Sequence, residues 1–281
     1  MNKQKLLQTI AKPLLGTGIG TRLPWAHQFY KKMYGQGRGT FVASIPLGLQ
    51  LSVQAGDLGP GLYLQTQGSY EPYETKIFLE NVKTKDVVFD IGAHVGYYTL
   101  LAGKKASQGK VVAFEADLAN QQLLMQNIKL NKLNNVTLVA KAIADKKGKV
   151  TFYQSQSSSG DHSLLDSGKE TKAVTVEATT LDLQAQEIGQ IPNILKIDVE
   201  GAELTVLKGA EKLLKNKKLR TIFLELSSLT TIAQTINILT KAGFSLNIID
   251  EKKTKQDKGD NIEILVKQIS KYGYINIVAM R

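Results

Sequence analysis

Short runs of β-branched and aliphatic residues alternate with longer helical patterns from Asp86 onward. This alternation is typical of βαβ units and of a mostly parallel sheet, so the fold class is α/β. We predict strands over residues 87–93, 110–115, 136–143, 193–199, 221–226 and 244–249. The intervening patterns predict helices over 97–105, through Leu123, Leu124 and Ile128, from Thr180, over 202–214 and over 232–242.

Two further strand pairs stand out from this alternation. Residues 149–153 and 173–177 read as a hairpin-like pair, separated by a Ser-rich stretch that is too polar for a core. Residues 262–266 and 274–279 also alternate, which predicts a terminal antiparallel pair around a turn at 271–273.

The first 80 residues have a different character. The pattern is helical and basic up to Tyr34, and from Thr40 to Tyr70 it becomes β-like and is interrupted by glycines. An apolar stripe within the first 15 residues either packs on the domain or lies on a membrane. We predict an N-terminal helical and β cap over residues 1–80 and a catalytic domain over 81–281.

The composition excludes several kinds of site and segment. The chain has no cysteine, which excludes disulfides, thiolate metal sites and a cysteine nucleophile. No apolar run reaches the ~18 residues that a transmembrane helix requires. Lys12 and Pro13 interrupt the N-terminal apolar stretch before a signal-peptide core can form. We therefore expect a cytoplasmic protein without a transmembrane segment.

The net charge is +11, from 36 Lys and Arg against 25 Asp and Glu. A nucleic-acid partner would need this charge on one face. The lysine clusters instead fall at predicted turns and element ends, at 146–149, 215–218 and 252–255. A solvated surface is the favoured interpretation, and a nucleic-acid partner is not expected.

The segment VVFDIGAHVGYYTL, residues 87–100, carries the strongest chemical signal. An apolar strand ends in Asp90 and turns through Gly92 and Gly96 into a helix. A dinucleotide fingerprint has closer glycines and no acid facing the phosphates. The acid here suits a ligand with nearby positive charge, such as the ammonium and sulfonium of S-adenosylmethionine. A tight turn with a capping acid is the structural alternative.

Two other strand ends would lie at the same sheet edge. Glu115 ends the second strand, about 20 residues after the glycine loop, where an acid can accept hydrogen bonds from both ribose hydroxyls. Ala142 and Ile143 end the third strand, where they flank an adenine or serve as ordinary core. The segment LKIDVEGAE, residues 195–203, brings Asp198 and Glu200 to this edge, with Lys196 just before them. Buried charges are costly unless they are paired or used, so the segment is either a site or a structural Lys–acid pair.

These motifs together resemble a known family. YEPYE, VVFDIGAHVGYYTL, VVAFEAD, AIAD and LKIDVEGAEL follow one another between Tyr70 and Leu226. The ordered set is similar to the FkbM family of S-adenosylmethionine-dependent methyltransferases. The resemblance implies a Rossmann-like class I methyltransferase fold, with a seven-stranded, mostly parallel sheet and an antiparallel C-terminal strand. It also implies methylation of an oxygen in a sugar, a polyketide or a related metabolite.

The resemblance implies roles for individual residues. Asp90, Gly92 and Gly96 would line the methionine part of the cofactor, Glu115 would bind the ribose, and Asp198 would lie near the methyl group. His94 stands where family members commonly have Asn; both residues can donate a hydrogen bond, so we expect cofactor binding to be retained. The full set of expected cofactor contacts is Asp90, Gly92, His94, Gly96, Tyr97, Glu115, Ala116, Ala142, Ile143 and Asp198.

An alcohol acceptor must lose a proton, which requires a base within hydrogen-bond reach. The candidates are Asp198, Glu200 and His162, and the last lies in a polar segment that either folds over the pocket or is an exposed loop. No zinc site is expected, and a divalent ion on Asp198 and Glu200 stays open.

Three functions remain possible from the sequence. The first is a small-molecule O-methyltransferase. The second is a methyltransferase acting on RNA or protein, and the third is a noncatalytic cofactor-binding protein. A basic groove leading to the cofactor would favour the second, and a closed pocket would favour the first.

Overall fold

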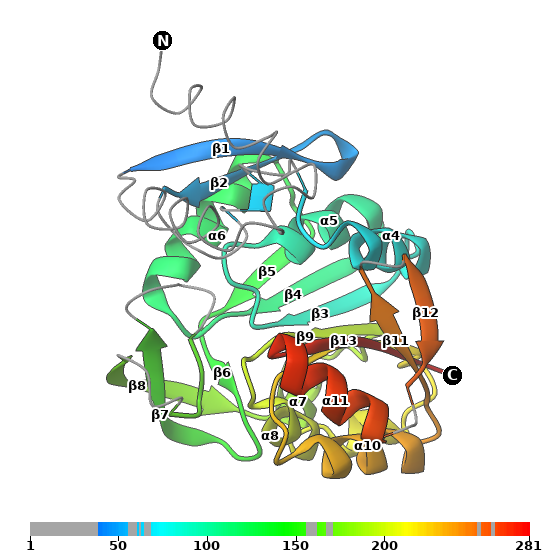
Figure 1. Cartoon of the computed structure of the whole chain (residues 1–281). Helices are drawn as coiled ribbons and strands as arrows, with labels where there is room; N and C mark the ends of the chain where they lie inside the picture. The colour runs from blue at the N-terminus through cyan, green and yellow to red at the C-terminus, as the bar shows by residue number, and fades with distance from the viewer. Residues whose placement is uncertain are drawn as a thin grey trace, which may run out of the picture.

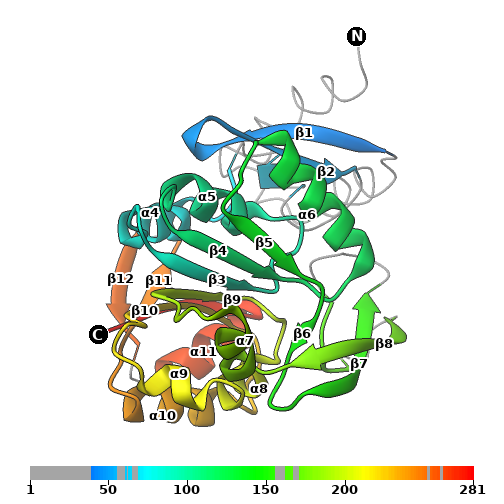
Figure 2. The same cartoon turned by 180° about the vertical axis from the view of Figure 1, so that it is seen from behind.

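The computed structural model describes residues 39–55, 61, 63–64, 69–155, 162–166, 171–251, 254–259 and 262–281. The helical pattern expected up to Tyr34 and most of the Ser-rich stretch lie outside these residues. The described segments form an eight-stranded, a three-stranded and a two-stranded sheet. The largest sheet lies at the centre, between two groups of helices (Figures 1 and 2).

The central sheet has the strand order β12-β11-β13-β10-β9-β3-β4-β5. Its strands are β3 (Val87–Ile91), β4 (Lys110–Phe114), β5 (Val136–Val139), β9 (Ile194–Ile197), β10 (Thr221–Leu226), β11 (Ser245–Asp250), β12 (Lys255–Lys258) and β13 (Ile275–Met280). The five strands from β10 to β5 are parallel, and β13 runs antiparallel between β10 and β11. The α/β fold class with an antiparallel C-terminal strand is thereby confirmed. The sheet has eight strands rather than seven, because β12 adds a short edge strand beside β11.

Helices cover both faces of this sheet, because successive strand residues point to opposite sides. Val88 and Val111 belong to one core with α4 and α5, while Phe89 and Val112 belong to the other, with α7 to α11. The helices are α4 (Pro72–Asn81), α5 (Tyr97–Lys105), α6 (Leu118–Leu130), α7 (Leu181–Ile188), α8 (Glu203–Lys208), α9 (Glu211–Lys215), α10 (Ile232–Lys241) and α11 (Ile262–Tyr272). α6 covers the sheet beside α5 (Figure 1).

The hairpin of β1 (Thr40–Ile45) and β2 (Leu49–Gln54) packs on α5 and α6. Two asparagines, one in α6 and one at its C-cap, complete the hydrogen bonds of β2. The Asn127 side chain accepts from the amide of Ser52 at 2.7 Å and donates to its carbonyl at 2.9 Å. Asn131 makes the same pair of bonds with Gln50, at 2.8 and 2.6 Å. The spacing of the two asparagines fits that of Ser52 and Gln50, because one helical turn and two strand residues both span about 6 Å.

Replacing Asn127 by alanine is expected to lower the free energy of unfolding by about 3 kcal/mol, because three hydrogen bonds are lost and buried backbone groups remain unpaired. The third bond runs from Asn127 to the carbonyl of Val95 at 2.8 Å, and Asn127 is fully buried. Asn131→Ala is the matched control, with an expected loss of about 1 kcal/mol or less, since its bonds to β2 are exposed to solvent. Urea unfolding measures both variants, and equal losses would contradict the structure.

The strand predicted over 136–143 is wrong in its extent. β5 ends at Val139, and β6 (Ala142–Ile143) leaves the central sheet to join β7 (Gly148–Ser155) and β8 (Thr171–Thr179) in a separate three-stranded sheet. β7 and β8 are antiparallel, so the predicted hairpin-like pair is confirmed. This smaller sheet lies beside the end of β5 in both views (Figures 1 and 2).

Two other predictions need correction. The helix expected over 202–214 is broken into α8 and α9 at Gly209, where a Cβ atom would lie 2.1 Å from the carbonyl oxygen of Ala144. Residues 262–266 form the start of α11 instead of a strand, because Leu265 and Ile269, one helical turn apart, are its buried residues. The terminal pair is absent for this reason, and the partners of β13 are β10 and β11.

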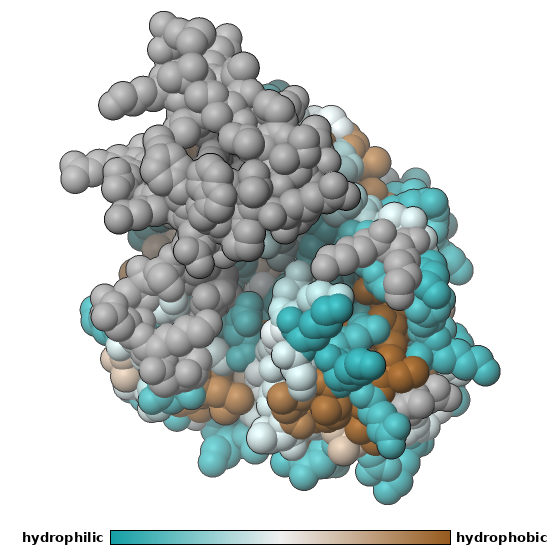
Figure 3. Space-filling model, in the orientation of Figure 1, coloured by the Kyte–Doolittle hydropathy of each residue, from teal (hydrophilic) through white to brown (hydrophobic). Residues whose placement is uncertain are grey.

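α11 also exposes apolar side chains, which is why its sequence resembles a strand. Ile262, Ile264 and Val266 are all partly exposed. Figure 3 shows apolar surface gathered in its lower part, the region where α10 and α11 lie in Figure 1. No helix within the described ranges is long and apolar enough to cross a membrane. The cytoplasmic location stays a prediction.

Candidate functional site

A cavity with about 530 Å³ of empty space, part of it open to solvent, lies at the carboxyl ends of β3, β4 and β9. This is the edge at which open α/β sheets bind ligands. The lining residues are Ile91, Gly92, His94, Phe114, Glu115, Ala116, Asn120, Lys141, Ala142, Ile143, Phe152, His162, Ser163, Leu164, Asp198 and Val199. Eight of them were predicted from the sequence: Gly92, His94, Glu115, Ala116, Ala142, Ile143, His162 and Asp198.

Gly92 brings the loop after β3 against the loop after β9. Its φ is +78°, and a Cβ atom here would lie 1.8 Å from the backbone oxygen of Asp198. Only glycine tolerates both this conformation and this approach. The close contact sets the positions of His94 and Asp198 on adjacent sides of the cavity.

His94 also has a left-handed backbone, with a φ of +52°. Asn and His are among the non-glycine residues that adopt this conformation most readily. His94 therefore adopts the left-handed backbone as readily as the Asn that family members commonly have here. The amide hydrogen of His94 donates to Glu115 Oε2 at 2.7 Å.

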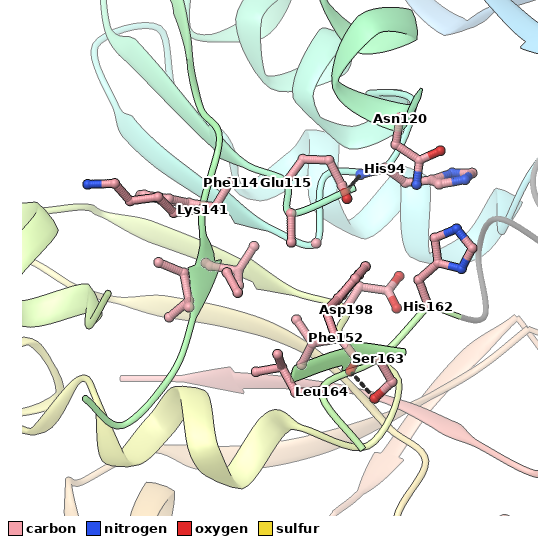
Figure 4. A pocket seen from close by; sticks show the side chains of 16 residues that line it. His94, Phe114, Glu115, Asn120, Lys141, Phe152, His162, Ser163, Leu164 and Asp198 are labelled. Atoms are coloured by element: carbon pink, nitrogen blue, oxygen red, sulfur yellow. Dashed lines mark hydrogen bonds between the residues drawn. The ribbon is translucent and has the colours of Figure 1, made fainter. Parts of the chain in front are cut away.

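Glu115 is the central acid of the cavity. Its second oxygen, Oε1, accepts a hydrogen bond from the amide of Asp117 at 2.8 Å. Burial raises the pKa of Glu115 to about 7, against the lowering effect of these amide bonds. Glu115 and Asp198 approach the cavity from opposite sides (Figure 4). A carboxylate has about four acceptor sites, so Glu115 retains capacity for a ligand's hydroxyl groups.

Three of the predicted cofactor contacts do not line the cavity. Asp90 is buried behind the loop and accepts a hydrogen bond from Thr99 Oγ1 at 2.5 Å. Burial raises the pKa of Asp90 to about 6. Gly96 begins α5 with a φ of +99°, and Tyr97 bonds through its hydroxyl to the carbonyl of Tyr70. These three residues support the loop after β3 from the side that faces away from the cavity.

Other lining residues have no clear signal in the sequence, because they belong to segments whose position depends on the fold. Asn120 comes from the first turn of α6, Lys141 from the link between β5 and β6, and Phe152 from β7. Ser163 and Leu164 follow His162 in the segment that reaches the cavity from the smaller sheet. A helix-capping signal at Asp117 was the one local hint that Asn120 faces this edge.

His162 is held in place by two neighbours. Its Nδ1 accepts a hydrogen bond from the amide of Ser155 at 2.9 Å, and its Nε2 lies 3.9 Å from Asp117 Oδ2. Asp117 also caps α6 by accepting from Ala119 and Asn120, and it accepts a short bond from Gln154. Because Nδ1 already accepts, the neutral ring carries its proton on Nε2. This arrangement suits a positioning role better than that of a general base.

A buried network begins behind Asp198. Lys196, which is 1% exposed, has its Nζ 3.2 Å from Glu74 Oε1 and 3.4 Å from Asp198 Oδ2. Burial alone would lower the pKa of Lys196, but Glu74, Asp198 and two further acids, Glu71 and Glu225, raise it above its usual value. Lys196 is thus a fixed cation between α4 and the end of β9. Asp198 Oδ1 receives no hydrogen bond from the described residues.

Glu200 does not line the cavity, although it was predicted as a catalytic candidate. Its backbone is left-handed, with a φ of +49°. One oxygen each of Glu200, Asp198 and Glu225 lie within 4.8 Å of one another. Of the two predicted acids after β9, Asp198 lines the cavity and also belongs to a carboxylate cluster beside it, whereas Glu200 belongs to the cluster alone.

Residues 90–246 match the profile of the methyltransferase FkbM domain. The chain belongs to the FkbM methyltransferase family. It is 28% identical over 144 residues to hexuronic acid methyltransferase AglP of Haloferax volcanii, covering 50% of this chain and 56% of that protein. It is 27% identical over 147 residues to methyltransferase 1 of Beauveria bassiana, covering 44% and 58%. The chain thus spans less than two thirds of the length of these curated relatives.

Among solved structures, precorrin-6y C5,15-methyltransferase from Geobacter metallireducens is similar, with a TM-score of 0.45 and 14% identity, over 74% of this chain and 88% of that one. S-adenosylmethionine is the cofactor of the FkbM methyltransferase class, and the cavity has suitable groups for it. A buried carboxylate can accept from ribose hydroxyls, and Phe114, Ala142 and Ile143 provide apolar surface for a purine.

Proposed function

We propose that the chain transfers the methyl group of S-adenosylmethionine to a hydroxyl group of a small polyhydroxylated acceptor, such as a uronic acid. The observation that carries this proposal is the convergence of Glu115 and Asp198 on one cavity, in a chain of the FkbM family. The relative AglP is named as a hexuronic acid methyltransferase, which supports a sugar acid as the acceptor class.

The lining residues support one orientation of the cofactor. Glu115 would accept hydrogen bonds from both ribose hydroxyls, and the apolar surface of Ala142 and Ile143 would hold the adenine. The loop at Gly92 and His94 would then border the methionine part, and Asp198 would border the methyl group.

The bound cofactor would supply an electrophilic methyl group, which passes from sulfur to the acceptor oxygen as one bond breaks and the other forms. The protein's contribution is positioning, because the oxygen must approach opposite the sulfur at about 3 Å. Asp198 is suited to accept the hydrogen bond, and then the proton, of the attacking hydroxyl through Oδ1. Lys196 would hold the other oxygen of Asp198 in place, at 3.4 Å.

The cavity's charges favour a small acceptor over a nucleic acid. Its lining includes two acids, Glu115 and Asp198, and one lysine, Lys141. A groove for a phosphate backbone would instead need clustered Lys and Arg along its walls. The acids suit hydroxyl groups, which donate hydrogen bonds to carboxylates.

Methyl transfer from labelled cofactor to a panel of uronic acids, neutral glycosides, lipids and RNA tests this function. We expect transfer to a member of the uronic acid or glycoside set, and a turnover about 100-fold lower in Asp198→Asn. The affinity of Asp198→Asn for the demethylated cofactor should change little, because Asp198 acts on the acceptor. Glu211→Gln, on the exposed surface of α9, is the control and should retain full turnover. Transfer to RNA alone would overturn the proposal.

A further inference from the structure

A cluster of acidic side chains lies beside the cavity, on the face of the sheet covered by α4. It includes Asp198 and Glu200 after β9, and Glu225 in β10. One carboxylate oxygen from each lies within 4.8 Å of the other two. Two oxygens that bind the same ion at 2.1–2.4 Å can be separated by up to about 4.8 Å. The three acids are therefore close enough to share one ion.

Glu225 is the member that points to a ligand. It is 7% exposed, and no described residue donates a hydrogen bond to its carboxylate or forms an ion pair with it. A buried carboxylate without a partner costs several kcal/mol, so an acid in this state requires a compensating cation or a proton. The charged groups that act on Glu225 are mainly acidic, namely Asp198, Glu200 and Glu71, and Lys196 is the one cation among them.

The lysine does not neutralise this cluster. Lys196 Nζ contacts Glu74 at 3.2 Å and Asp198 at 3.4 Å, and no ion pair joins it to Glu225. Glu71 is satisfied separately, since it accepts hydrogen bonds from Tyr98 at 2.8 Å and Asn276 at 3.1 Å. Among the described residues, Glu225 therefore has no cation in ion-pair contact with it.

We propose that Asp198, Glu200 and Glu225 bind one divalent cation that prefers oxygen ligands, such as Mg²⁺, Mn²⁺ or Ca²⁺. The ligand set contains carboxylates alone, which favours these ions over zinc or copper. Three carboxylates leave coordination positions for water or for oxygens of another molecule.

The position of Asp198 gives this site a consequence for the proposed function. Asp198 also lines the cofactor cavity, so the cation would lie at the wall where the acceptor hydroxyl is expected. Two neighbouring oxygens of a sugar acid could then replace bound water on the ion. This consequence rests on the proposed methyl transfer, whereas cation binding itself does not.

Binding of Mn²⁺ to the purified chain, measured by electron paramagnetic resonance without cofactor or acceptor, tests the site. We expect one Mn²⁺ per chain, displaced by Mg²⁺ or Ca²⁺, and about 30-fold weaker binding in Glu225→Gln. Glu225→Gln keeps the side-chain volume and removes repulsion among the acids, and a thermal transition like that of the wild type is the check that it is folded. Glu211→Gln is the matched control and should bind Mn²⁺ as the wild type does.

Absence of Mn²⁺ binding by the wild-type chain at millimolar concentration would overturn the proposal. Equal binding by wild type and Glu225→Gln would overturn it as well, because the ion would then lie elsewhere. A chain that methylates its acceptor in the presence of a chelator would retain the proposed function and lose the link between the cation and the acceptor. The two proposals therefore fail by different measurements.

Discussion

Alanine at position 92 is expected to abolish cofactor binding and to lower the free energy of unfolding by about 3 kcal/mol or more. The added Cβ would lie 1.8 Å from the backbone oxygen of Asp198, a contact that neither segment can accept without moving. The left-handed backbone adds about 1 kcal/mol of strain. Separation of the two loops would displace both His94 and Asp198 from the cavity. Calorimetry with the demethylated cofactor and urea unfolding measure the two effects.

Gly189→Ala is the control for this experiment. Gly189 ends α7 with a φ of +70°, close to the +78° of Gly92, and a Cβ atom at position 189 would have no neighbour within 4 Å among the described residues. We expect a loss of about 1 kcal/mol and unchanged cofactor affinity. Wild-type affinity in Gly92→Ala would contradict the close approach of the loops after β3 and β9.

Glu115→Gln is expected to weaken binding of the demethylated cofactor by about 100-fold. Charge-assisted hydrogen bonds contribute about 1.5–3 kcal/mol each, and about 1.4 kcal/mol corresponds to a tenfold change in affinity. The substitution removes the charge and one of the two acceptor oxygens that would face the ribose. Glu177→Gln, on the exposed side of β8, is the control and should bind normally. Unchanged affinity in Glu115→Gln would contradict the proposed orientation of the cofactor.

The same side chain predicts a pH dependence. Burial raises the pKa of Glu115 to about 7, so the free protein takes up a proton on this carboxyl as the pH falls through 7. Ribose hydroxyls donate to the ionised form, and binding must therefore release that proton at lower pH. Affinity should be constant above pH 8 and fall by up to about tenfold per pH unit below 7. Calorimetry at pH 6, 7 and 8 tests this, and Glu115→Gln should remove the dependence.

Local patterns predicted the elements that carry their own signals. Residues 97–105 and 221–226 are helix and strand to the residue, because a glycine turn begins the first and an apolar run defines the second. Residues 136–143 carry a continuous β pattern, but β6 pairs with β8 instead of continuing beside β4. Pattern alone does not specify the partner of a strand. Residues 262–266 fit the hydrophobic period of a helix as well as that of a strand, and their packing in α11 determines that they are helical.

The same distinction holds for the site: residues at strand ends were predicted, and residues placed by tertiary contacts were not. Glu115 and Asp198 follow strands, and parallel strands bring their carboxyl ends to one edge, so their convergence follows from the sequence. Asp90 also belongs to this edge, but its side chain turns toward Thr99, on the face covered by α5. Phe152 and Leu164 reach the cavity through the smaller sheet, whose placement depends on contacts between distant segments. Glu225 lies in a strand interior, where no local pattern distinguishes a ligand from a structural acid.

The ion pair between Glu74 and Lys196 bears on where the folding unit around the central sheet begins. The sequence suggested a boundary after residue 80, yet α4 starts at Pro72 and delivers Glu74 to the middle of the sheet. A shortened protein starting at residue 81 would keep the lysine and lose this counterion, leaving an ammonium enclosed without its main neutralising group. We therefore expect the smallest autonomous folding unit to include α4 and Glu74, so any dissection of this chain should cut before that helix.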